Sequence, residues 1–196
     1  MKKLLLIVSI LYGTLTFAQD TGYFFGGFES NSQWLLNDEG LNFIAPEDQF
    51  RANNYFRLDY NLGEFTAGVQ YETYLPAALL GYAPIYDNNN GIGTYYLNFK
   101  HKALDITAGY FYEQFGSGMT LRSWEDKNLG INNSIRGLNT KYRINDEFNI
   151  TALIGQQKKG FKYSKGYILG FDSEFDFSKI TNGSTLLMGL SYVGRS

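Results

Sequence analysis

Four charged side chains gather around one of the chain's two tryptophans: Arg122, Glu125, Asp126 and Arg136 around Trp124. Opposite charges at this spacing can pair with one another, and an indole ring offers a flat surface for stacking. One interpretation is a loop that folds into an interior, where it constricts a passage or forms a ligand site with Trp124 as the stacking surface. The other is an exposed loop that folds on itself through salt bridges. The sequence leaves both interpretations open.

Residues that could catalyse a reaction are poorly placed. A serine hydrolase normally needs a histidine base, and the sole histidine, His101, falls in a short connection between two predicted strands. Asp105 and Glu113 lie on one side of the same predicted strand, but eight residues of extended chain would separate them by more than about 25 Å. That separation is too long for paired acid–base chemistry. We therefore expect no enzymatic activity, no metal site and no cofactor.

Alternation of apolar and polar side chains dominates the chain and predicts β-strands. In Phe65–Glu72, for example, Phe65, Val69 and Tyr71 share one side. The same pattern predicts strands over residues 22–36, 54–60, 93–100, 104–113, 148–155, 166–171 and 186–192. A further strand is expected around residues 135–141, where a bulge near Gly137 would restore the alternation. The predicted fold class is therefore all-β.

Charged side chains within the better strands fall on the polar side only: Arg57, Asp59, Glu72, Lys100, Asp105 and Glu113. We assign Arg136 to the same side. In a membrane barrel these charges would face a hydrated lumen, because an arginine or lysine that faces lipid at the bilayer midplane costs about 2–4 kcal/mol. A soluble β-sandwich also alternates, so alternation alone does not separate the two folds.

Connection lengths favour the barrel. Tight turns are expected at residues 61–64, 101–103 and 144–147, and longer connections at residues 37–47, 75–92 and 114–132. Short and long connections thus alternate, as they do in outer-membrane barrels with short periplasmic turns and longer extracellular loops. We expect an antiparallel transmembrane β-barrel, with a soluble exported β-domain as the alternative.

The first eighteen residues have the pattern of a secretory signal peptide. Lys2 and Lys3 precede a short apolar run, and Thr16 and Ala18 occupy the −3 and −1 positions of a small-residue cleavage site. We expect residues 1–18 to be removed and residues 19–196 to form the barrel in a bacterial outer membrane. The 16 Tyr, 16 Phe and 22 Gly suit strands and interfacial aromatic girdles. The formal charge of −2 argues against a nucleic-acid partner.

The predicted strands raise a question about closure. About nine alternating segments are recognisable, whereas bacterial single-chain barrels have an even number of strands. The chain also ends without the terminal aromatic residue that outer-membrane barrels often carry. We therefore expect residues 19–196 to be the N-terminal portion of a larger barrel, incomplete at its C-terminus.

A resemblance supports this location. Residues 112–139 read YEQFGSGMTLRSWEDKNLGINNSIRGLN and follow the strand sequence GTYYLNFKHKALDITAGYF. Together with the Phe-Ala-Gln cleavage site, they resemble an uncharacterised family of outer-membrane proteins from Bacteroidota, and the RSWEDKNLGINN loop is the most specific part. The resemblance implies an outer-membrane location and a chain longer than this one, and it implies no activity.

Two functions remain open. The first is a transport-class barrel, either a porin-like channel or a gated pore for small solutes, with these lumen-facing candidates: Arg57, Asp59, Glu72, Lys100, Asp105, Glu113 and Arg136. The second is a non-conducting structural or interaction barrel that binds an outer-membrane protein partner through its extracellular loops. Outer-membrane lipid surrounds the barrel in either case.

Overall fold

A computed structural model describes residues 21–76, 90–127, 130–179, 181 and 184–196. The expected signal peptide, residues 1–18, lies outside the described residues, as does most of the connection expected at residues 75–92. No helix in the described part of the chain is long and apolar enough to cross a membrane.

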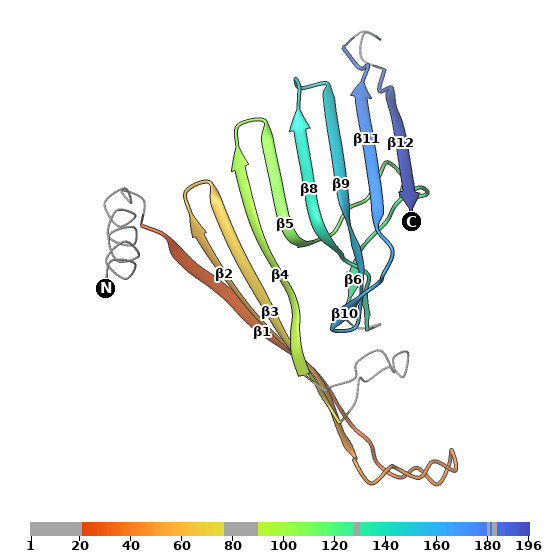
Figure 1. The fold of residues 1–196 in the computed structure, drawn as a ribbon. Helices are drawn as coiled ribbons and strands as arrows, with labels where there is room; N and C mark the ends of the chain where they lie inside the picture. The colour runs from red at the N-terminus through yellow and green to blue at the C-terminus, as the bar shows by residue number, and fades with distance from the viewer. Residues whose placement is uncertain (1–20, 77–89, 128–129, 180, 182–183) are drawn as a thin grey trace, which may run out of the picture.

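The described chain is an antiparallel β-sheet in which neighbouring strands follow one another in sequence (Figure 1). Its strand order is β1-β2-β3-β4-β5-β8-β9-β11-β12, with β10 paired to β9. The strands are β1 (Tyr23–Trp34), β2 (Phe50–Leu62), β3 (Phe65–Leu75), β4 (Asn90–His101), β5 (Leu104–Phe111), β8 (Ile135–Arg143), β9 (Phe148–Lys159), β10 (Lys162–Tyr163), β11 (Ile168–Asp176) and β12 (Leu187–Arg195). A separate hairpin pairs β6 (Glu125–Asp126) with β7 (Ile131–Asn132). The all-β antiparallel prediction is confirmed, and every predicted strand is present.

The tight β2–β3, β4–β5 and β8–β9 turns lie at one end of the sheet, here called the turn end, and the longer connections after β1 and β5 lie at the other, the loop end. The longer β11–β12 connection, residues 177–186, also lies at the turn end. In Figure 1 the turn end is uppermost. The β2–β3 and β4–β5 turns contain Gly63 at φ 55° and Lys102 at φ 49°, which is the left-handed conformation that two-residue hairpins favour. The expected alternation of short and long connections is therefore confirmed for the three predicted turns.

The two faces of the sheet differ sharply in chemistry. One face, here called the outer face, carries exposed apolar side chains from β1 to β12, among them Phe28, Phe56, Val69, Leu97, Leu138, Phe171 and Leu190. The opposite, inner face carries most of the charged side chains. The inner face is concave, because side chains of β3 and β9 meet across it although three other strands lie between them. Strand alternation thus places apolar side chains on the outer face and most ionisable side chains on the inner face.

The sheet is open, because β1 and β12 are its two edges and do not pair with each other. The connection between β5 and β8, residues 112–134, is here called the inner loop. It folds back over the inner face, so that Phe115 packs against Ile135, Leu153 and Ile168. These residues and Phe111 form the apolar core of the described chain.

Candidate functional site

The inner face carries an ion pair and a tyrosine, Arg57, Asp59 and Tyr96, near its middle. Arg57 donates from Nε to Asp59 Oδ2 at 2.7 Å and from Nη2 to Asp59 Oδ1 at 3.2 Å. The Tyr96 hydroxyl donates to Asp59 Oδ1 at 2.7 Å. A Cβ on Gly68 would lie 2.3 Å from the Tyr96 ring, so glycine is needed at this point to let the ring lie flat on the sheet. The buried Asp59 carboxylate therefore holds two side chains of the wall in place, while the Arg57 side chain remains 54% exposed.

Glu72 is a second buried carboxylate on the same face. It accepts from Gln70 Nε2 at 3.0 Å and from the Tyr74 hydroxyl at 2.7 Å. A β-bulge between Gln70 and Tyr71 leaves Gly93 beside this carboxylate, where a Cβ would come within 1.8 Å of Glu72 Oε1. The bulge and its glycine therefore make the space in which Glu72 is bound.

Lys100, Asp105 and Glu113 gather towards the turn end of the inner face, where they line one hollow together with Lys141. The predicted separation of Asp105 and Glu113 is wrong. β5 ends at Phe111, and the chain then turns back, so Glu113 Oε2 accepts from Asn139 Nδ2 at 2.7 Å and pairs with Lys141 Nζ at 2.8 Å. Lys141 is itself the register partner of Asp105. The argument from an extended strand failed because the strand stops before Glu113.

The first half of the inner loop is held by apolar packing. Phe115 is 2% exposed, and its core neighbours come from β8, β9 and β11. Leu121 and Val193 pack against the same core. Gly170 on β11 lies directly under Phe115, since a Cβ there would approach the Phe115 ring to 3.0 Å. This half of the loop is therefore anchored to the C-terminal strands of the sheet.

The second half of the inner loop reaches across to the N-terminal strands through polar contacts. Gln70 Nε2 on β3 donates to Glu125 Oε1 at 3.3 Å, and Asn132 Nδ2 donates to the same oxygen at 2.8 Å. Lys127 Nζ lies 2.8 Å from Glu29 Oε2 on β1 and 4.8 Å from the ring centre of Tyr55 on β2. We call the Lys127–Glu29 and Glu125–Gln70 contacts the latch.

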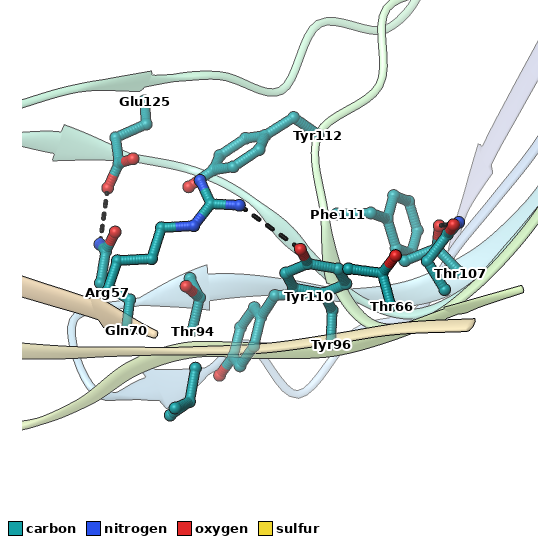
Figure 2. A pocket seen from close by; sticks show the side chains of 12 residues that line it. Arg57, Thr66, Gln70, Thr94, Tyr96, Thr107, Tyr110, Phe111, Tyr112 and Glu125 are labelled. Carbon is teal, nitrogen blue, oxygen red and sulfur yellow. Dashed lines mark hydrogen bonds between the residues drawn. The ribbon is translucent and has the colours of Figure 1, made fainter. Parts of the chain in front are cut away.

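A cavity of about 390 Å³ lies between the latch and the wall of the sheet (Figure 2). Figure 2 shows the Arg57 guanidinium projecting between Tyr112 and Tyr96. The lining is mixed, with Thr66, Thr94, Asn98 and Thr107 beside these residues and Val69 and Phe111 as apolar members. Thr66 and Thr107 accept from Asn61 Nδ2 and Asn98 Nδ2, and a hydroxyl that accepts a hydrogen bond can also donate one. The cavity can therefore hold water or a small polar solute.

The loop candidates occupy different surroundings. Arg122 is exposed and stacks over the Trp124 ring, with Cζ 5.2 Å from its centre. Glu125 lines the cavity, and Asp126 follows it in β6. Of the two interpretations of this loop, the contacts of Glu125 and Lys127 match the inward one. The expected pairing of Arg122 and Arg136 with Glu125 and Asp126 does not describe the contacts found.

The prediction for Arg136 is wrong. The register pairs Arg136 with Tyr110 and Gln156 and places it on the face of Leu138, which is the outer face. The other six lumen-facing candidates lie on the inner side, either within its strands or, for Glu113, against Asn139 and Lys141. No bulge occurs near Gly137, because the β5–β8 and β8–β9 registers run without a shift. The irregular pattern of this strand has another cause, namely that Ile135 is an inner core residue.

Comparison with known proteins adds a family. A family model described as a family of unknown function, DUF6029, matches residues 1–196. The chain belongs to this family. A search of the curated proteins found no match.

The sequence of this DUF6029 chain did not predict three residues that shape the candidate site. Lys158 pairs with Glu72, Lys127 forms half of the latch, and Phe115 anchors the inner loop. The only signal for Lys158 was a lysine pair before Gly160-Phe161, and for Phe115 an aromatic residue before the glycines of the loop. Both partners of each contact are distant in sequence, so no local pattern could join them.

Proposed function

We propose that this sheet is part of a transmembrane β-barrel in a bacterial outer membrane and that its inner face lines a gated pore for small solutes. The observation that carries the membrane part is the distribution of side chains between the two faces. Outer-face residues such as Phe24 and Leu190 are 69% and 70% exposed, at opposite edges of the sheet. An apolar surface of this extent needs an apolar environment, and acyl chains supply one.

Strand direction bears on how the barrel closes. Each neighbouring pair is antiparallel, and an even number of steps leads from β1 to β12, so both edge strands run from the turn end to the loop end. Direct pairing of β1 with β12 would therefore be parallel. Closure with antiparallel pairs alone requires an odd number of further strands, which agrees with the even strand number of bacterial barrels. This proposal keeps the sheet as one portion of a larger barrel.

The location rests on two further arguments. In lipid, backbone groups at an open sheet edge would lack partners, so a sheet can enter a bilayer only as part of a closed barrel. The resemblance of residues 112–139 to outer-membrane proteins of Bacteroidota favours the outer membrane.

The pore is proposed to be gated because its blocking loop is held in two different ways. Phe115 anchors one half of the inner loop in an apolar core, whereas the latch and the contact of Lys127 with the Tyr55 ring hold the other half. Exposed ion pairs contribute only about 0–1 kcal/mol. The latched half can therefore leave the cavity while the anchored half stays, and this movement would open a path along the polar wall.

Single cysteines test the membrane part cleanly, because the chain has no cysteine of its own. Leu138→Cys places a label on the outer face and Asn139→Cys places one on the inner face of the same strand. After reconstitution into vesicles, a fluorophore at residue 138 should be quenched by a lipid-soluble quencher and one at residue 139 by an aqueous quencher. Equal quenching of both labels by the aqueous agent would overturn the membrane assignment.

Planar-bilayer recordings of the full-length protein test the gate. The unmodified protein should show rare current steps, and Lys127→Met or Glu29→Gln should make them several-fold more frequent because either change removes the ion pair of the latch. Lys102→Met, in the β4–β5 turn, is the matched control and should change nothing. If the latch variants insert into the bilayer but show no current steps, the proposed pore is contradicted.

A second candidate function is a non-conducting barrel that binds an outer-membrane protein partner through its loops. The observation that favours it is the apolar core on the inner side, which fills space that an open channel would need. Inserted but electrically silent protein, with or without the latch, is the result expected for this candidate.

A further inference from the structure

Arg136 breaks the pattern of the outer face. It pairs in register with Tyr110 and Gln156 and shares its face with Leu138. It is the one arginine of the described strands on this face, and no Asp or Glu of the large sheet shares it. A single cation on a surface proposed to face acyl chains needs a partner, because an unpaired charge in an apolar medium is costly.

The side chains around Arg136 hold it without neutralising it. Its guanidinium Cζ lies 3.4 Å from the centre of the Tyr163 ring, and Nη2 donates to Gln156 Oε1 at 3.4 Å. Arg136 and Gln156 line a hollow of about 470 Å³ together with Leu138, Ile154 and Tyr167. No carboxylate lines this hollow. These contacts therefore fix the position of the guanidinium, and its positive charge can bind an anion from outside the protein.

The neighbouring connection adds further positive charge. Lys159, the last residue of β9, is exposed, and so are Lys162 and Lys165 on the segment that joins β9 to β11. This segment lies against the hollow, since Gln156 Nε2 donates to the carbonyl oxygen of Ser164 at 3.0 Å. The lysines thus stand at the loop-end side of Arg136, where an anionic surface would meet them.

The level of Arg136 along its strand fits an interface. It is the second residue of β8, at the loop end, and Tyr110, Tyr163 and Tyr167 surround it. Tyrosines with an apolar ring and a wet hydroxyl are typical of the membrane–water boundary. An arginine on the lipid face costs about 0–1 kcal/mol there, far less than at the midplane.

We propose that Arg136 binds the phosphate of an anionic lipid headgroup in the leaflet at the loop end. A planar guanidinium can hold two phosphate oxygens at once, and the exposed lysines add attraction as point charges. Lipid is favoured over soluble phosphate because Leu138 and Ile154 form an apolar wall beside the cation, where an acyl chain can pack. This inference rests on the proposed function, since it requires the outer face to meet lipid.

The test compares heat-induced unfolding in phosphatidylcholine vesicles with and without a minor fraction of phosphatidic acid, whose headgroup is a bare phosphate. Phosphatidic acid should raise the Tm of the unmodified protein. In Arg136→Gln the apparent affinity for phosphatidic acid should fall about tenfold, as expected for the loss of a charge-assisted bidentate contact. Arg136→Lys should retain part of it. Arg143→Gln, on the inner face at the turn end, is the matched control and should retain all of it.

Each alternative has a distinct result. An unchanged affinity in Arg136→Gln overturns the site, and so does an equal Tm rise from inorganic phosphate in neutral detergent, which would mark a soluble-anion site. Should Arg136→Gln fail to insert, the double variant Lys159→Gln/Lys162→Gln replaces it, and an undiminished response there also overturns the proposal. Failure of the unmodified protein to insert into phosphatidylcholine vesicles would instead contradict the membrane assignment, and the lipid site with it.

Discussion

Lys158 Nζ lies 3.7 Å from Glu72 Oε2, although β4, β5 and β8 separate the two strands that carry these residues. Their side chains are 0% and 1% exposed. The ion pair therefore connects β3 directly to β9 across the concave inner face, near the loop end. Two buried charges lose hydration, and the loss is offset only when further hydrogen bonds complete the arrangement, as Gln70 and Tyr74 do for Glu72.

Removal of one partner should be costly. Lys158→Met leaves the Glu72 carboxylate buried without its cation, and we expect the free energy of unfolding to fall by about 3–5 kcal/mol. The double variant Glu72→Gln/Lys158→Met should recover most of that loss, because neither buried charge remains. Urea unfolding in lipid vesicles measures both. Lys159→Met, which alters an exposed neighbour, is the control, and equal losses in the single and double variants would contradict the coupling.

Phe115→Ala should release the anchored half of the inner loop. Truncation of a buried phenylalanine typically costs about 3–5 kcal/mol, since both burial and packing are lost. Phe115 is 2% exposed among core residues of three strands, so we expect a loss in this range. Met119→Ala in the same loop is the control, because Met119 is 93% exposed and should change stability little. Rapid proteolysis within residues 113–122 should accompany the Phe115 change alone.

The strands were predictable from the sequence because apolar and polar residues alternate along a strand whose two faces have different surroundings. Phe65, Val69 and Tyr71 alternate with inner residues, and the confirmed turns join strands only a few residues apart. Contacts of this kind depend on near neighbours in the chain. The same local information supported the inner position of Arg57, Asp59, Glu72, Lys100 and Asp105.

The candidate site was less predictable, because it depends on how the sheet curves and where one loop turns back. Glu113 was placed on an extended strand that ends at Phe111, and Arg136 was placed inside by charge alone. An arginine on the outer face contradicts the simple rule that charges face inward. No local pattern could reveal that Lys127 meets Glu29, which lies 98 residues earlier in the chain.

Val69→Arg tests the outer face energetically. Val69 lies on the outer face, mid-way along β3 and paired with Leu58 and Tyr95. In a bilayer an arginine at such a depth should lower the free energy of unfolding by about 2–4 kcal/mol. Thr66→Arg, on the inner face of the same strand, should be tolerated far better because its charge can be hydrated. Equal stability of the two variants in vesicles would indicate that the outer face does not contact acyl chains.

The pair formed by Glu147 and Lys179 joins the β8–β9 turn to the β11–β12 connection. The hydrogen bond from Lys179 is the main reason that the pKa of Glu147 lies below its usual value. A carboxyl whose folded-state pKa is depressed stabilises the fold above its unfolded pKa, and this contribution is lost as the pH falls through the folded value. The contribution is small, because both groups are close to solvent.

Lys179→Met should therefore raise the pKa of Glu147 towards the ordinary value of about 4.3. Titration of the glutamate carboxyl by carbon-13 NMR in detergent micelles measures the change directly. Lys102→Met, which removes a lysine from another turn at the same end of the sheet, should leave the pKa of Glu147 as it is. If Glu147 titrated at the same pH in all three proteins, the contact with Lys179 would not persist in solution, and the two connections at the turn end would move independently.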